Sequence, residues 1–97
     1  MMVLVTYDVS TENSKGQSRL RKVARVCKDY GQRVQNSVFE LIVTPAEMVE
    51  VKHKLEEIID IEKDSIRYYH MGKNWQIHVE SVGKKTSFDP ERDVFIF

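Results

Sequence analysis

The chain contains few of the residues that mark secreted and membrane-bound proteins. It has a single cysteine, Cys27, so no disulfide can form within the chain, and one free thiol fits a reducing cytosol. No apolar run approaches the roughly 20 residues that a membrane-spanning helix needs. The opening segment MMVLVTYD lacks the basic start and the long apolar stretch of a secretory signal. We therefore expect a cytoplasmic protein without a membrane partner.

The chain has no formal net charge at pH 7, because 15 basic residues balance 15 acidic ones. The charges are nevertheless unevenly distributed along the chain. Residues 15–28 include six cations and no acid, whereas residues 47–64 include seven acids and three lysines. A basic stretch of this kind can bind a polyanion, but both stretches can equally be solvated helix faces.

The first third of the chain predicts a strand followed by a helix. Residues 2–9 are rich in β-branched and aromatic side chains, which predicts a buried strand. Over about 15–30, apolar residues recur at intervals of three and four, as on one face of a helix. Gly31 follows directly, in the C′ position where helices commonly end on a left-handed glycine.

The next segment, RVQNSVFELIV at 33–43, allows two interpretations. If Asn36 and Ser37 form a two-residue turn, the segment is a hairpin with an apolar pair on one face and an ion pair on the other. It could instead be one bulged strand, because Asn-Ser is a weaker turn signal than Asn-Gly. The hairpin would pair Val34 with Phe39 and Arg33 with Glu40.

A second helix is predicted to begin at the sequence TPAE. Thr44 is placed to cap it, Pro45 suits its first position, and Glu47 completes a capping box. Apolar residues then recur at helical spacing as far as Ile59, which predicts one buried face.

Two more strands, at 64–71 and 75–83, complete the order β-α-β-β-α-β with one strand to spare. That order is the split βαβ or ferredoxin-like pattern, an α+β fold. The spare strand and the apolar tail VFIF can cover an exposed sheet edge. We expect one domain over 1–97, with a core at about 1–75 and a surplus strand and tail at about 76–97.

Asp8 closes the first strand, where the apolar run would otherwise continue. An ionised carboxylate there must meet solvent, hydrogen-bond donors or a cation, because burying it unpaired is costly. In a βαβ unit, the carboxyl end of the first strand lies beside the following loop, where sites commonly form. Asp8 is therefore a candidate site residue, or alternatively a cap for its own turn through the amides of Ser10 or Thr11.

The cations of the first predicted helix form a second candidate site. Arg21, Arg25 and Lys28 are spaced i, i+4 and i+7, and Arg19 and Lys22 are spaced i and i+3. Such a ladder suits the phosphates of a nucleic-acid backbone and has no base specificity of its own. Other chemistries are weakly represented, since the three histidines show no ligand spacing and no phosphate loop or nucleophile elbow is present.

Three features together resemble the family of CRISPR-associated protein 2. They are YDVS at the end of the first strand, RLRKVARVCKDYGQRVQNSVFE at 19–40, and the length of the chain. The resemblance implies a ferredoxin-like homodimer with facing sheets, in which the additional C-terminal strand crosses to the partner's sheet edge. It also implies that two copies of Asp8 face each other across the two-fold axis and hold one divalent cation, Mg²⁺ or another such as Mn²⁺.

The resemblance further implies a metal-dependent endonuclease, acting on RNA in some members and on double-stranded DNA in others, with Asp8 as catalytic and metal-binding residue. It implies a subunit of the CRISPR adaptation, or spacer-acquisition, machinery in antiviral defence, which bridges dimers of the CRISPR-associated protein 1 integrase. Two alternatives stay open: a non-catalytic architectural DNA-binding adaptor, and a toxin-type ribonuclease relative. The expected nucleic-acid-binding residues are Arg19, Arg21, Lys22, Arg25, Lys28 and Arg33.

Overall fold

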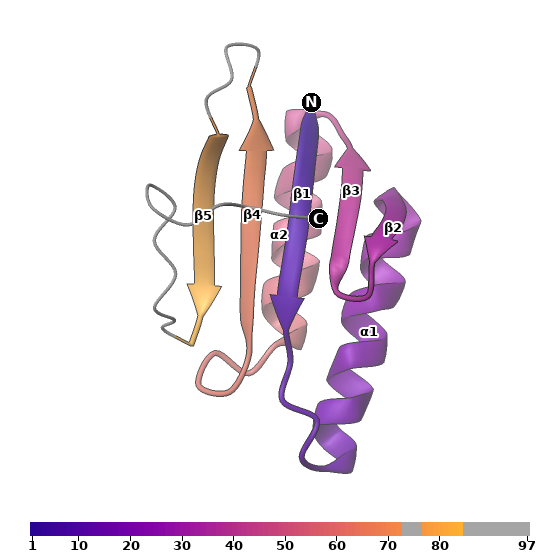
Figure 1. Ribbon diagram of the computed structural model, residues 1–97, viewed down its shortest axis with the longest axis vertical. Helices are drawn as coiled ribbons and strands as arrows, with labels where there is room; N and C mark the ends of the chain where they lie inside the picture. The colour runs from indigo at the N-terminus through magenta and orange to yellow at the C-terminus, as the bar shows by residue number, and fades with distance from the viewer. Residues whose placement is uncertain (73–76, 85–97) are drawn as a thin grey trace.

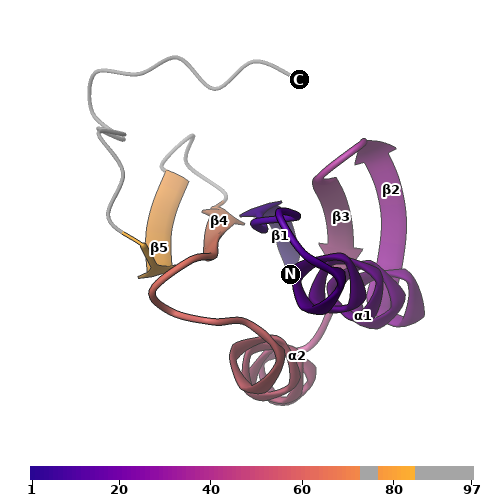
Figure 2. The same cartoon turned by 90° about the horizontal axis from the view of Figure 1, so that it is seen from below.

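The structure is a computed structural model that describes residues 1–72 and 77–84. In this part of the chain, five strands form one antiparallel sheet, and two helices cover the same face of it (Figure 1; Figure 2). The elements are β1 (Met2–Asp8), α1 (Ser14–Tyr30), β2 (Gly31–Gln35), β3 (Val38–Ile42), α2 (Pro45–Ile58), β4 (Ser65–Met71) and β5 (Ile77–Gly83).

The strand order across the sheet is β2-β3-β1-β4-β5. β1 therefore lies at the centre and pairs antiparallel with both β3 and β4. β3 separates β1 from β2, so the first βαβ unit is split as a ferredoxin-like fold requires. The expected α+β class, its element order and the additional strand are confirmed.

Strand β5 contains part of the surplus segment that was expected at about 76–97. It pairs with β4 of its own chain along its whole length, from Ser65↔Gly83 to Met71↔Ile77. Residues 77–83 thus extend the chain's own sheet, which corrects the expectation that this strand crosses to a partner's sheet. The tail from residue 85 onward lies outside the described residues, so a crossing there, and the homodimer itself, stay predictions.

The core lies between the sheet and the two helices. Because side chains alternate along a strand, Val3, Val5 and Tyr7 of β1 point to the helices and are buried there. Each fully buried side chain of this size contributes roughly 1.5–3 kcal/mol. Asp8 is exposed and lies on the opposite, helix-free face. Neither helix in the described residues is long and apolar enough to cross a membrane.

Helix α1 has a side-chain cap at its start, and it ends differently from what the sequence predicts. Asn13 caps its start, accepting a hydrogen bond from the Gly16 amide at 2.9 Å. At its end, Gly31 is fully extended (φ −169°, ψ −154°) and starts β2 directly, so the expected left-handed C′ glycine is wrong. A Cβ at Gly31 would lie 2.1 Å from the carbonyl oxygen of Glu40. The glycine is needed because β3 passes so close.

Helix α2 begins as the sequence predicts. Thr44 accepts a hydrogen bond from the Glu47 amide at 3.1 Å, and the Glu47 carboxylate accepts one from the Thr44 amide at 3.0 Å. Pro45 is the first helical residue. The capping box is therefore confirmed.

The hairpin is also confirmed, but its register differs from the predicted one. Gln35 pairs with Val38 across the Asn36-Ser37 turn. A bulge between Arg33 and Gln35 then shifts the pairing by one residue, which corrects the predicted register. The shift puts Arg33 opposite Phe39, and its guanidinium lies 5.1 Å from the centre of that ring. The observed pairs are Arg33 with Phe39 and Gln32 with Glu40.

Candidate functional site

Asp8 lies at the end of β1, where the strand leaves the sheet, directly opposite Ser65 of β4. Its side chain is exposed on the helix-free face. Around it is an open hollow of about 130 Å³, lined by Thr6, Tyr7, Asp8, Ser65 and Arg67. The β1–β4 ladder thus brings one carboxylate (Asp8), two hydroxyls (Thr6 and Ser65) and one guanidinium (Arg67) to one face of the sheet at this small concavity. The Tyr7 side chain is buried on the helix side.

The Asp8 carboxylate makes no hydrogen bond or ion pair with the rest of the described chain. The Ser10 amide, which Asp8 could have capped, donates instead to Asp64 Oδ1 at 3.0 Å. The turn-cap interpretation of Asp8 is therefore wrong. An exposed carboxylate without a structural task is available to a ligand.

One chain alone is a poor metal site. Among the described residues, no group of three or more His, Cys, Asp or Glu side chains could hold a metal ion. Mg²⁺, however, keeps several waters and usually takes only one or two protein carboxylates in addition to substrate phosphates. Asp8 fits a site of that kind if a second copy of the chain supplies the second carboxylate.

Asp64 is the residue that the sequence reasoning missed. It is fully buried, yet charged, and its carboxylate accepts four hydrogen bonds. These come from the Ser10 amide (3.0 Å), the Asp60 amide (2.9 Å), Arg19 Nε (2.7 Å) and Arg19 Nη2 (3.3 Å). Burial by itself would raise the pKa of Asp64, but these hydrogen bonds and the Arg19 charge outweigh it and lower that pKa below its ordinary value.

Arg19 has a different role from the one expected of it. Its Nε and Nη2 groups both donate to Asp64, and its side chain is only 17% exposed. The hydrogen bond to Asp64 raises the pKa of Arg19. The assignment of Arg19 to the nucleic-acid-binding ladder is therefore corrected, because Asp64 occupies its charge and two of its donors.

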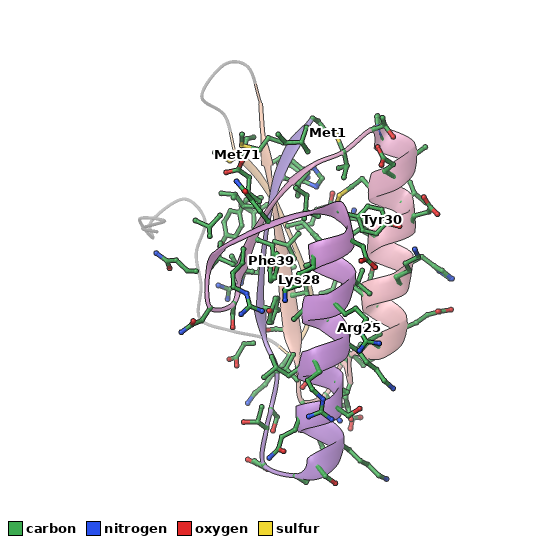
Figure 3. The ribbon with its side chains drawn as sticks, turned by 90° about the vertical axis from the view of Figure 1, so that its right-hand side faces the viewer. Met1, Arg25, Lys28, Tyr30, Phe39 and Met71 are labelled. Carbon is green, nitrogen blue, oxygen red and sulfur yellow. The ribbon has the colours of Figure 1, made fainter. Side chains whose placement is uncertain are left out.

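The other predicted cations of α1 are all exposed. Arg21, Lys22, Arg25 and Lys28 lie on the solvent side of the helix, and Figure 3 shows Arg25 and Lys28 along it. Arg33 is exposed on the edge strand β2, above Phe39. These side chains belong to the helix layer or the β2 edge and do not line the hollow at Asp8.

A second polar cluster joins α2 to the far end of the β4–β5 pair. His70 lies opposite His78, and Glu80 Oε1 is 3.2 Å from His70 Nε2 and 4.0 Å from His78 Nε2. Lys52 of α2 forms an ion pair with the other oxygen of Glu80. This hydrogen bond from Lys52 is the main reason that the pKa of Glu80 is lowered. The cluster ties α2 to β5 and lies outside the Asp8 hollow.

Comparison with known proteins gives one consistent result. The family described as CRISPR associated protein Cas2 matches residues 1–79. The chain is 54% identical over 91 residues to the CRISPR-associated endoribonuclease Cas2 of Nitratidesulfovibrio vulgaris, which covers 94% of this chain and 89% of the relative. It is 53% identical over 97 residues to the CRISPR-associated endonuclease Cas2 of Halalkalibacterium halodurans, which covers 100% of both chains.

A solved structure agrees with these sequence relatives. The crystal structure of Streptococcus pyogenes Cas2 aligns with a TM-score of 0.71 at 68% sequence identity, over 77% of this chain and 90% of that one. The likeness therefore includes the fold as well as the sequence.

Proposed function

The chain belongs to the CRISPR associated protein Cas2 family, and from this premise we propose that it is an endonuclease subunit of the CRISPR adaptation machinery in antiviral defence. It hydrolyses phosphodiester bonds with Mg²⁺, or another divalent cation such as Mn²⁺. Asp8 is the metal-binding and catalytic residue. The observation that supports this most is the exposed Asp8 carboxylate, which has no structural partner among the described residues.

The roles of the residues follow from their charges. A divalent cation bound here supplies a polarised water and neutralises charge on the phosphate. Asp8 binds the cation, and the same residue of a second copy completes its protein ligands. Arg67 lines the same hollow, where its positive charge favours a phosphate. The homodimer is part of the proposal, because one copy of Asp8 is a weak ligand set.

The substrate is a nucleic acid, either RNA or double-stranded DNA. The Nitratidesulfovibrio vulgaris relative is named an endoribonuclease, and the Halalkalibacterium halodurans relative is named an endonuclease. Both polymers present the same phosphodiester to a metal site. The cleavage assay below therefore uses both RNA and duplex DNA.

A second function, that of a DNA-binding adaptor in the cytoplasm, is favoured by the exposed cations of α1. They lie outside the Asp8 hollow, so duplex DNA can bind there independently of cleavage. In this role the dimer would bridge dimers of the CRISPR-associated protein 1 integrase. The two functions are compatible in one molecule.

The test is a cleavage assay on RNA and on duplex DNA, with wild type and Asp8→Ala, each with Mg²⁺ and with a chelator. We expect cleavage only by wild type with Mg²⁺. An equal rate for Asp8→Ala would contradict the nuclease assignment to Asp8. Duplex binding that Asp8→Ala retains, with cleavage lost, would support both functions.

A further inference from the structure

We propose that Asp64 positions Asp8 for metal binding, with Arg19 holding the Asp64 carboxylate in place. This inference rests on the function proposed above. It assigns a role in the nuclease site to two residues that do not line the Asp8 hollow.

The position of Asp8 depends on its backbone alone. Its carboxylate has no partner within the described chain. The pairing of β1 with β3 ends at Thr6↔Val38, followed by one hydrogen bond from the Tyr7 amide to the Ser37 carbonyl at 3.1 Å. At Asp8, only Ser65 of β4 flanks the strand. Contacts that fix the backbone on the β4 side of Asp8 therefore also fix the position of the Asp8 carboxylate.

Asp64 fixes the backbone of both strands at the Asp8–Ser65 pair: that of β4 through its bond to Ser65, and that of the β1 end through Ser10. It is bonded covalently to Ser65, the cross-strand partner of Asp8. Through Oδ1 it also accepts the amide of Ser10, two residues after Asp8, at 3.0 Å. Its own carbonyl accepts the Lys84 amide at 2.8 Å, which joins the end of β5 to the same point.

Arg19 keeps the Asp64 carboxylate ionised and correctly oriented. Its Nε contacts Oδ2 at 2.7 Å and its Nη2 contacts Oδ1 at 3.3 Å, so both carboxylate oxygens are bound from one side. A two-point contact of this kind fixes orientation as well as charge. A buried carboxylate without its cation would take up a proton or turn away, and the Ser10 amide would lose its acceptor.

A small displacement of Asp8 matters more here than at an ordinary surface site. Two copies of the carboxylate have to meet at one cation, and metal–ligand distances tolerate only about 0.2 Å of error. A misplacement of about 1 Å at a reacting centre costs on the order of 100-fold in rate. Loss of the Asp64 contact is therefore expected to weaken metal binding in variants that remain folded.

The experiment compares Asp64→Asn, Arg19→Met and Arg19→Lys with wild type in the full chain. Asp60→Asn is the matched control, because it removes a neighbouring carboxylate that does not contact Ser10. Circular dichroism first establishes a temperature at which each variant is folded. Mn²⁺ affinity by electron paramagnetic resonance, protection of the Ser10 amide from hydrogen exchange, and kcat and KM for RNA or duplex cleavage are then measured there.

We expect Asp64→Asn and Arg19→Met to lose at least about 10-fold in Mn²⁺ affinity, with a larger fall in kcat than rise in KM. Arg19→Lys keeps the charge and should recover part of what Arg19→Met loses, and Asp60→Asn should behave as wild type. If Asp64→Asn does not fold, the two Arg19 variants decide. Wild-type Mn²⁺ affinity and kcat in a folded Arg19→Met protein would overturn the inference.

Asp8→Asn separates this inference from the function on which it rests. If Asp8→Asn binds Mn²⁺ and cleaves as wild type does, the proposed nuclease site is wrong and the positioning role falls with it. If Asp8→Asn loses both while folded Asp64→Asn and Arg19→Met keep both, the nuclease site stands and only the positioning role is wrong.

Discussion

Asp8 and Ser65 form the last cross-strand pair of the β1–β4 ladder, and the Asp8 side chain is exposed. Asp64, the residue directly before β4, is fully buried and accepts four hydrogen bonds. Two aspartates at one end of the sheet therefore have opposite tasks. Asp64 is structural, and Asp8 is open to a ligand.

The first prediction concerns the stability of Asp8 variants. Because the carboxylate has no partner in the described chain, Asp8→Asn and Asp8→Ala should change the free energy of unfolding by no more than about 0.5 kcal/mol. Asn13→Ala is the control, since Asn13 is a real helix cap and its loss should cost about 1 kcal/mol. Urea unfolding measures both. A cost for Asp8→Ala as large as that for Asn13→Ala would contradict the assignment.

The second prediction concerns the exposed cations of α1. Replacing Arg21, Arg25 and Lys28 together by Gln should weaken nucleic-acid binding uniformly across sequences, because the contacts are to phosphates. The slope of log affinity against log salt should fall by about 0.9 for each lost duplex contact. Titrations at several salt concentrations measure it, with Lys63→Gln, an exposed loop cation, as control. An unchanged slope would place the contacts elsewhere, with Arg33 and Lys84 next.

The fold was predictable where the signals are local. A run rich in β-branched and aromatic residues predicts β1. A capping box that needs only Thr44 and Glu47 predicts the start of α2. The exposure of Asp8 was predictable for the same reason, because an unpaired charge at the end of a strand has to be accessible to solvent or a ligand. Its role as a metal ligand stays a proposal.

The features that the sequence did not predict depend on contacts between segments that are distant in the sequence. Arg19 and Asp64 are 45 residues apart, and nothing near either one in the sequence distinguishes a buried ion pair from two surface charges. The bulge beside Arg33 likewise depends on Phe39 of the neighbouring strand. Sequence periodicity describes which face a residue occupies, and it does not describe which partner meets it there.

The third prediction tests why Gly31 is a glycine. Its backbone is extended, which any residue can adopt, but an added Cβ would lie 2.1 Å from the Glu40 carbonyl oxygen and 2.6 Å from Leu41 Cδ2. Gly31→Ala and Gly31→Asn should therefore both destabilise the chain by about 1–3 kcal/mol. Thermal unfolding compares the two. A left-handed cap would tolerate Asn much better than Ala, and that result would contradict the structure.

The fourth prediction is a loss of stability in acid. The pKa of Asp64 is lower in the folded chain than its unfolded value of about 3.9. Its contribution to stability is therefore complete above that value and is lost as the pH falls through the lower folded pKa. Urea unfolding between pH 2 and 6 should show a steep acid limb that Asp64→Asn flattens.

Glu80 is the comparison for this acid limb, because its pKa is also lowered, mainly by the hydrogen bond from Lys52. Its side chain is 35% exposed, so solvent screens the interaction and Glu80→Gln should flatten the limb much less. An acid limb that Glu80→Gln removes and Asp64→Asn leaves intact would show that the buried pair is not its cause.

The last prediction concerns the homodimer. On the helix-free face, Ile42 is 71% exposed beside Met2, whereas Val49 on α2 is 68% exposed on the helix side. In a monomer these two side chains are equally accessible, so Ile42→Lys and Val49→Lys should be equally well tolerated. If two sheets face each other, only Ile42→Lys removes buried apolar area and places a charge between them. At roughly 1.5 kcal/mol or more for each copy, the dimer should weaken about 100-fold or more.

Light scattering over a range of concentrations measures this difference. Wild type and Val49→Lys should have about twice the 11.4 kDa mass of one chain, and Ile42→Lys should shift toward a single chain. A chain that ends before Phe88 should also shift, because it lacks the apolar tail. A wild-type monomer at high micromolar concentration would contradict the dimer. It would also leave Asp8 without the second carboxylate on which the metal site depends, so this measurement bears on the proposed function as directly as the cleavage assay does.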